Sequence, residues 1–184
     1  MDNINIFLSK TEGMRNGYLK MLDRADLDFK GKWLKHFGFL PNFFKEIYSV
    51  CNGTKPEINE QVFFDFIPGF RLMQVDEIIE KYEKEFINNI EFKIIIPFLA
   101  DYASNYYAYA IKSDIECIVL VEDDEIEIIH YDISSFWKTI IAFYDEDVYY
   151  LDEDGYLSYD FEKECYVGRK YNSEIDYWKQ NISI

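Results

Sequence analysis

Apolar residues recur at steps of three and four from residue 43 to residue 51, which is the spacing of one face of a helix. Pro41 presets a helical φ angle and lacks the N–H that a first helical turn leaves unpaired, so the helix is predicted to begin there. Asn52 and Gly53 tolerate the left-handed backbone that ends many helices. The sequence therefore predicts a helix of about three turns, with a buried face made of Phe43, Phe44, Ile47, Tyr48 and Cys51.

The chain around this helix is less regular. Residues 1–12 show little pattern and are predicted to be a loosely held terminus, whereas residues 13–28 carry apolar side chains at helical spacing, weakened by glycines. Residues 33–39 are predicted to form a short helical turn. Residues 62–67 are rich in β-prone side chains, and Pro68-Gly69 follows them as a turn signal.

The later part of the chain gives clearer signals. Residues 70–73 are either a short strand or the approach to a helix over 75–88, which has one apolar side and charged pairs at four-residue spacing. Apolar runs then predict strands, followed by a helix over 134–144 and a hairpin over 148–159 that turns at an Asp-Gly pair. The predicted strands cover residues 94–100, 106–111, 117–121 and 125–131.

Together these elements predict an α+β fold, with a mostly antiparallel sheet of about five or six strands and helices packed on it. The chain has no fixed-period repeat and no low-complexity linker, so residues 1–184 are predicted to form a single domain. The core of this domain is predicted over residues 33–144. Residues 145–184 are predicted to be a C-terminal extension that contains the hairpin and whose last aromatic residues fold back on the body.

The composition is that of a folded protein: 49% of the 184 residues are hydrophobic and 19% are aromatic. The apolar run over residues 94–100 is too short to span a bilayer, and the N-terminus lacks the basic flank and apolar stretch of a secretion signal. Cys51, Cys117 and Cys165 are odd in number and widely spaced in apolar or aromatic surroundings, which predicts reduced, buried thiols. We therefore expect a cytoplasmic protein without a membrane partner.

The net charge of −16 is concentrated in the later part of the chain. Residues 114–164 hold 17 acidic residues against two basic ones, Lys138 and Lys163, so they carry nearly the whole imbalance. A surface of this sign disfavours nucleic acid and anionic membranes and attracts basic partners. A solvated acidic face that serves solubility would carry the same charges, so the pattern alone leaves both interpretations open.

Catalytic signatures are absent from the sequence. His36 and His130 stand far apart and outside any ligand motif, and they are interpreted as surface or partly buried side chains. Aligning Gly155 with the glycine of a calcium loop places Tyr150 and Phe161 where oxygen ligands are required, so a calcium site is excluded there. No carboxylate pair stands out for glycoside chemistry. The sequence predicts a protein that is not an enzyme and has no cofactor or metal.

The order of the elements resembles the SMI1/KNR4, or SUKH, superfamily over about residues 33–144. The resemblance is carried by Leu40-Pro41 opening a helix, the aromatic pair after it, and Asn52-Gly53 closing it. A strand, a second helix, a run of strands and a late helix near Phe136 then follow in the family's order. The opening helix of the family is not evident in the first forty residues, which differ from the pattern at that end. The resemblance implies an α+β fold in which Leu40, Pro41, Asn52 and Gly53 define the fold and do not bind a ligand.

The resemblance also implies a role, since bacterial members of the superfamily are chiefly immunity proteins that neutralise polymorphic toxins, many of them nucleases or deaminases. A toxin that acts on nucleic acid presents a basic cleft, which an acidic and aromatic surface complements. The alternative is an intracellular scaffold or regulatory module without an immunity role. The predicted contacts with the toxin are Glu122, Asp123, Asp124, Glu125, Asp145, Asp147, Tyr149, Tyr150, Asp152, Asp154 and Tyr156.

Overall fold

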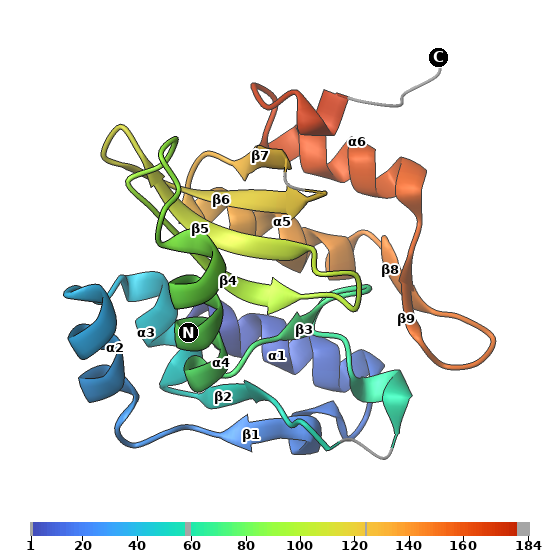
Figure 1. The fold of residues 1–184 in the computed structure, drawn as a ribbon. Helices are drawn as coiled ribbons and strands as arrows, with labels where there is room; N and C mark the ends of the chain where they lie inside the picture. The colour runs from blue at the N-terminus through green and yellow to red at the C-terminus, as the bar shows by residue number, and fades with distance from the viewer. Residues whose placement is uncertain (1, 58–59, 124, 180–184) are drawn as a thin grey trace.

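The computed structural model describes residues 2–57, 60–123 and 125–179 and confirms the predicted α+β fold. In this part of the chain a central antiparallel sheet has helices on both sides (Figure 1). Its five strands lie in the order Arg71–Leu72 (β3), Ile94–Ala100 (β4), Tyr106–Lys112 (β5), Ile115–Glu122 (β6) and Glu125–His130 (β7). The predictions for β4 to β7 are therefore correct to within two residues at each end.

The other elements surround this sheet. Two strand pairs lie outside it: Leu22–Arg24 (β1) with Cys51–Thr54 (β2), and Tyr149–Leu151 (β8) with Leu157–Tyr159 (β9). The helices are Asn3–Met14 (α1), Phe29–Phe37 (α2), Asn42–Tyr48 (α3), Val75–Lys81 (α4), Ile133–Asp145 (α5) and Phe161–Tyr171 (α6). Short helical turns are Tyr18–Met21 (η1), Gln61–Phe63 (η2), the π-type turn Tyr82–Phe86 (η3), and Tyr177–Lys179 (η4).

Both faces of the central sheet are packed because successive residues of β5 point to opposite sides. On one face Tyr109 meets Phe43 of α3, with ring centroids 6.3 Å apart, and Phe43 in turn lies 5.7 Å from Phe136 of α5. On the other face Tyr106 packs edge-on against Phe86 of η3, with centroids 5.7 Å apart. Near-continuous apolar runs in β4 and β5 follow from this two-sided burial.

The helix predicted from Pro41 to Asn52 is only partly correct. Pro41 immediately precedes α3, as expected, but α3 ends at Tyr48 after about two turns. Residues Cys51–Thr54 form β2, which pairs with β1. The spacing of Cys51 from the preceding apolar residues fits a helix, and its side chain is buried as that pattern predicts. It is buried, however, as part of strand β2.

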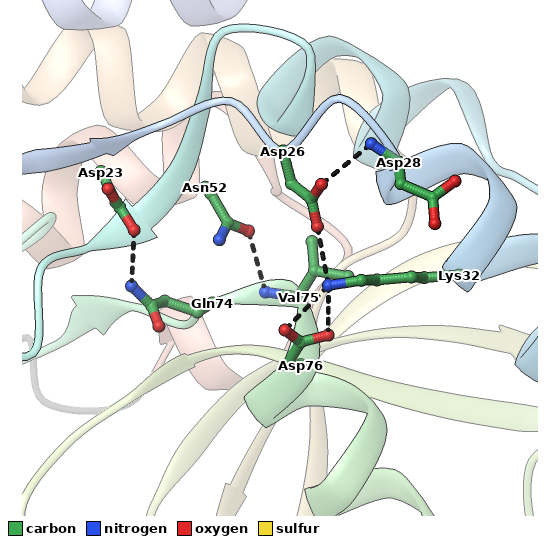
Figure 2. A network of polar contacts seen from close by, with 8 residues as sticks. All are labelled: Asp23, Asp26, Asp28, Lys32, Asn52, Gln74, Val75 and Asp76. Atoms are coloured by element: carbon green, nitrogen blue, oxygen red, sulfur yellow. Dashed lines mark hydrogen bonds and ion pairs between the residues drawn. The ribbon is translucent and has the colours of Figure 1, made fainter.

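Asn52 and Gly53 do not end a helix. The Asn52 side chain accepts a hydrogen bond from the backbone N–H of Val75, at the start of α4 (Figure 2). Gly53 has a φ of 88°, as its predicted left-handed tolerance requires, and a Cβ built there would lie 2.6 Å from the Met73 carbonyl oxygen. The pair thus joins β2 closely to the entry of α4. Leu40 is partly buried against the core.

The N-terminal predictions are wrong. Residues predicted to be loose form α1, whose Ile4, Phe7, Leu8 and Thr11 are buried at helical spacing. The predicted helix over 13–28 is replaced by η1 and β1, because Gly17 adopts a φ of 101° and the chain then pairs with β2. One polar residue inside the buried stripe of α1, Thr11, and the position of α1 at the N-terminal end of the sequence hid this element.

The structure of residues 62–88 agrees in part with the sequence prediction. Residues 62–67 form no strand: they hold the end of η2 and a tight turn in which the Gly69 N–H donates to the Asp65 carboxylate at 2.9 Å. The turn at Pro68-Gly69 is therefore confirmed, and within residues 70–73 the short strand β3 forms. The helix predicted over 75–88 is confirmed as α4 continued by η3.

The C-terminal elements pack on the same core. The helix over 134–144 and the hairpin are confirmed as α5 and β8–β9, while α6 was not predicted. The tail folds back as expected: Trp178 is 2% exposed, and its indole N–H donates to the Ile129 carbonyl of β7 at 2.6 Å. Gly168 of α6 makes room for this ring, since a Cβ there would lie 2.0 Å from it. The three cysteines are buried and free, as predicted.

Candidate protein-binding surface

The first group of predicted contact residues lies at the tip of the β6–β7 hairpin. Glu122 and Glu125 stand directly opposite each other across the two strands, and both side chains are exposed. Asp123 is exposed in the turn with a positive φ of 47°, while Asp124 lies outside the described residues. Like charges in directly opposed positions destabilise a strand pair. The tip therefore concentrates negative charge, and this charge lowers the stability of the strand pair.

The second group lies on the β8–β9 hairpin, where the register separates inward from outward side chains. Tyr149 faces Tyr159 across the pair, and on the opposite side of the hairpin Tyr150 and Tyr156 are 45% and 41% exposed. Tyr149 is only 2% exposed and packs against Phe143 of α5 with centroids 5.2 Å apart. The prediction of Tyr149 as a surface contact is therefore wrong.

The acidic residues of this hairpin have different roles. The Asp152 carboxylate accepts hydrogen bonds from the backbone N–H groups of Asp154 and Tyr156, at 3.0 and 2.9 Å, and so holds the turn that Gly155 closes with a φ of 86°. Asp154 is exposed and leaves its charge available. Asp152 contributes charge and also fixes the position of Tyr156.

Asp145 and Asp147 lie where α5 leads into β8. The Asp145 carboxylate forms an ion pair with Lys10 of α1, which offsets its charge, although its side chain stays 55% exposed. Asp147 is exposed with a φ of 51°, and its carbonyl oxygen accepts a hydrogen bond from Lys163. Of these two residues, Asp147 is the better placed to attract a cation.

The two hairpins lie on the same side of the molecule (Figure 1). Both Glu122 of β6 and Glu164 of α6 raise the pKa of the same phenol, that of Tyr107 on β5, although burial raises it most. Tyr159 of β9 and Tyr177 of η4 act on this phenol too. In Figure 1 the β8–β9 hairpin and the end of β6 lie on the same side of the molecule. We call Glu122, Asp123, Glu125, Asp147, Tyr150, Asp152, Asp154 and Tyr156 the hairpin surface.

Sequence reasoning missed the residues between the hairpins. Glu164 lies in the first turn of α6, and burial raises its pKa from 4.5 to about 7. Tyr159, Phe161 and Tyr166 are 41%, 47% and 67% exposed, so they extend the aromatic surface onto α6. The alternation of acidic and aromatic residues from 159 to 166 could have been recognised in the sequence as an extension of this surface. The burial of Glu164 was not.

A second polar cluster surrounds the fold-defining Asn52 and has a structural role (Figure 2). Lys32 of α2 bridges Asp26 and Asp76, with Nζ–carboxylate distances of 2.8 and 2.9 Å. Asp23 of β1 accepts a hydrogen bond from the Gln74 side chain at 3.2 Å. These contacts tie α2, β1 and β2 to the start of α4, and Lys32 offsets part of the negative charge of the aspartates.

Side chains of reactive types also occur at the two histidines and in an open groove beside α1. His36 bonds Glu83 at 2.8 Å, whereas His130 is 1% exposed, so the expectation of a surface or partly buried side chain is wrong for His130. An open groove of about 550 Å³ lies between α1, η1 and β1. Its Glu12 carboxylate is engaged by two backbone N–H groups, and burial raises the pKa of its Cys51 thiol to about 11.

Two broader properties concern the described residues only. No three His, Cys, Asp or Glu side chains among them are grouped so as to hold a metal ion. None of the helices in this part of the chain is long and apolar enough to cross a membrane. Comparison with protein-family models gives no match for this chain, and comparison with curated proteins gives none either.

Proposed function

We propose that this protein is an immunity protein that binds and neutralises a cognate protein toxin through the hairpin surface. The observation that carries the proposal is the presence of exposed acids and exposed tyrosines on two hairpins that lie on the same side of the molecule (Figure 1). Isolated acids on a solvated face would serve solubility alone. Acids around exposed aromatic side chains on rigid strands have the composition of a protein interface.

The two kinds of side chain have different tasks in this proposal. The acids at the β6–β7 tip and at Asp154 attract a basic partner over distances of about a Debye length, roughly 8 Å at physiological salt, and so accelerate association. Tyr150 and Tyr156 provide large apolar areas that lose little conformational freedom on binding. Their positions are fixed before binding by the strand register and by the turn that Asp152 holds.

The charge of the surface indicates the kind of toxin. Enzymes that act on nucleic acid hold the phosphate backbone with Lys and Arg, and a cluster of carboxylates can occupy that position instead. We therefore propose a nuclease or nucleobase deaminase whose basic cleft is covered by the hairpin surface. The resemblance to the SMI1/KNR4 superfamily supports this choice, and membership in it remains part of the proposal.

The test is co-expression with a candidate toxin domain encoded by a neighbouring gene, scored by rescue of growth. Wild type is expected to rescue, and the purified pair is expected to associate at a rate that falls steeply with added salt. Lack of rescue together with lack of binding would refute the proposal and favour the scaffold alternative.

A charge-reversal variant locates the surface. Glu122→Lys, Glu125→Lys and Asp154→Lys together are expected to slow association by about tenfold or more at low salt and to weaken its salt dependence. Asp114→Lys is the matched control for the single reversal Asp154→Lys, since Asp114 is an exposed acid at the opposite end of β6 whose ion pair among the described residues is with Lys93 at 2.8 Å. Equal effects of the two variants would show that the contact lies elsewhere.

A further inference from the structure

Strand β7 is the outermost strand of the central sheet, next to β6 (Figure 1). In an antiparallel sheet one residue directs both of its backbone polar groups to one side of the strand, and the next residue directs them to the other side. An edge strand therefore carries N–H and C=O groups that a further strand can bind. One end of this edge is already occupied by η4, where Trp178 donates to the Ile129 carbonyl oxygen at 2.6 Å.

The pairing of β5 with β6 determines which groups of β7 face outward. The turn over residues 113–114 has φ angles of 51° and 64°, which is the type I′ geometry of a two-residue hairpin loop. Such a turn is closed by a hydrogen-bonded pair, here Lys112 and Ile115. Every second residue of β6 after Ile115 also bonds to β5, and these residues include Val119 and Val121.

Ile126 and Ile128 of β7 lie opposite these two valines. Because Val119 and Val121 direct their backbone groups to β5, Ile126 and Ile128 direct theirs away from β6, to the outer edge. None of the described residues donates to these groups or accepts from them. Unpaired backbone groups on a sheet edge are the feature that proteins use to bind an extended segment as an added strand.

The side chains beside this edge leave two hollows on one face of the sheet. Ile126 lines a hollow of about 380 Å³ together with Tyr106, and Ile128 lines one of about 210 Å³ together with Ile115 and Tyr131. Ile115 and Tyr131 are 60% and 51% exposed. Side chains two residues apart on a strand lie on the same face about 7 Å from each other. The two hollows therefore follow the spacing of side chains on an added strand.

We propose that the outer edge of β7 binds an extended segment of the protein partner as an additional antiparallel strand. This inference rests on the proposed function, because it states how the partner of the hairpin surface is held. The acidic tip of that surface, Glu122, Asp123 and Glu125, lies at the start of this same edge. The tip attracts a basic partner, and the edge then binds its main chain.

The sequence of β7 defines the chemistry of the bound segment. From Glu125 to Ile128 the strand alternates acidic and apolar residues. A complementary segment has apolar side chains two residues apart over Ile126 and Ile128, and lysine or arginine side chains on the opposite face beside Glu125 and Glu127. A second copy of this chain would bring its own glutamates against these glutamates, and opposed like charges destabilise strand pairs. The charge therefore favours a basic partner.

The experiment uses the full chain and a seven-residue peptide of alternating lysine and valine with blocked ends. Hydrogen exchange is followed by NMR. In the free protein the N–H groups of Ile126 and Ile128 are expected to exchange about tenfold or more faster than those of Val119 and Val121. The bound peptide supplies acceptors and is expected to slow the two isoleucine amides by about tenfold or more. Protection of these amides in the free protein would overturn the inference.

Two methylated peptides separate strand pairing from charge attraction. In an antiparallel pair, residues that exchange hydrogen bonds have side chains on the same face, so the valines of the peptide bond to Ile126 and Ile128. Backbone N-methylation of the valines is expected to weaken binding by about tenfold or more, because it removes these donors. Backbone N-methylation of the lysines alters groups that point to solvent and should leave the affinity close to that of the unmethylated peptide. Equal affinities of the two methylated peptides would overturn the inference.

A variant of the protein tests the same contact from the other side. Ile128→Pro removes an outward N–H and leaves the hydrogen bonds between β6 and β7 in place, so it is expected to weaken the peptide by about tenfold or more. Ile128→Val keeps the N–H and should bind like wild type. A folded Ile128→Pro protein that binds like wild type would overturn the inference. If this variant does not fold, the methylated peptides decide the question on the wild-type protein.

Failure of this inference is distinguishable from failure of the proposed function. Growth rescue and toxin affinity that survive a folded Ile128→Pro at wild-type level would overturn strand addition and leave immunity intact. A dimer in solution that Ile128→Pro dissociates would assign the edge to a second copy and also overturn the inference. Peptide binding at β7, in a protein that neither binds nor neutralises the candidate toxin, would support a receptor for basic strands and remove the proposed immunity role.

Discussion

Replacing Glu164 by glutamine should make the free protein more stable above neutral pH. Glutamine has nearly the same shape as glutamate but carries no charge, so it removes the burial penalty without opening a cavity. The carboxylate has no basic partner among the described residues, and therefore no ion pair is lost. Most substitutions at partly buried positions destabilise, which makes a gain in stability a distinctive outcome.

The size of the gain follows from the pKa. Burial raises the pKa of Glu164 from 4.5 to about 7. The folded protein therefore holds a proton between these values that the unfolded chain has lost, and wild-type stability falls as the pH rises through this window. At 1.36 kcal/mol per unit the loss reaches about 3 kcal/mol above pH 7, as an upper limit because the side chain keeps some contact with water.

The assay is urea denaturation at a series of pH values from about 4 to about 8, followed by tryptophan fluorescence. The difference in unfolding free energy between Glu164→Gln and wild type cancels the titration of all other groups. It is expected to be close to zero below about pH 4.5 and to grow to a plateau of at most about 3 kcal/mol above pH 7. Glu162→Gln, which removes the same charge from an exposed position in the same helical turn, should give a difference within about 0.5 kcal/mol at every pH.

Two results would refute this reasoning. A difference that does not change with pH would show that Glu164 titrates normally in the folded protein. A loss of stability at high pH would show that the carboxylate has a favourable partner.

Three further predictions concern close packing and buried charge. Gly168→Ala places a Cβ 2.0 Å from the Trp178 ring, so it should displace the indole, shift its fluorescence to longer wavelength and destabilise the protein by about 3 kcal/mol. Gly53→Ala combines a φ of 88° with a Cβ 2.6 Å from the Met73 carbonyl, and should lower the unfolding free energy measured in urea by about 2 to 4 kcal/mol. Burial lowers the pKa of His130 to about 4, so its ring signals in NMR should titrate near that value instead of near 6.5.

Matched glycine variants control the first two predictions. Gly13→Ala lies in α1 with open space around the new Cβ, and is expected to stabilise by up to about 1 kcal/mol through helix propensity. Gly17→Ala has a φ of 101° but no atom within 4 Å, so it should lose only about 1 kcal/mol to backbone strain. Equal losses at Gly53 and Gly17 would contradict the importance of the Met73 contact. A His130 signal that titrates near 6.5 would show that the imidazole is accessible to water.

The elements that sequence predicted correctly are those specified by their own residues. Strands β4 to β7 have apolar runs bounded by turn residues, and the β8–β9 turn carries Asp-Gly chemistry that fixes its backbone locally. The failures involve distant partners. Cys51 fits a helical stripe, but residues Cys51–Thr54 pair with β1, which lies more than twenty residues earlier in the chain. A pattern within one short window contains no information about such a partner.

The charge of the candidate surface was predictable from the sequence, but the burial of its individual side chains was not. Acids and aromatics from residue 122 to residue 156 were visible in the sequence, and the strand alternation that turns Tyr149 inward and Tyr150 outward could have been read from the period of two. Glu164 and Glu162 look alike in the sequence. Their difference arises because α6 packs against α5 and η4, which buries one side of its first turn.

Unfavourable electrostatic contacts are found in the region of this molecule that we propose binds the partner. Around Asn52, Lys32 bridges two carboxylates from different elements and Asp23 accepts a hydrogen bond from Gln74, and these contacts join the elements of the fold (Figure 2). Around the hairpins, Glu122 opposes Glu125 across the strands, and Glu164 is partly buried with no basic partner among the described residues. Each of these features lowers the stability of the free protein, and each becomes favourable once a basic surface covers it. A protein that retains such strain in one region is expected to use that region, because natural folds keep costly local features mainly where function needs them.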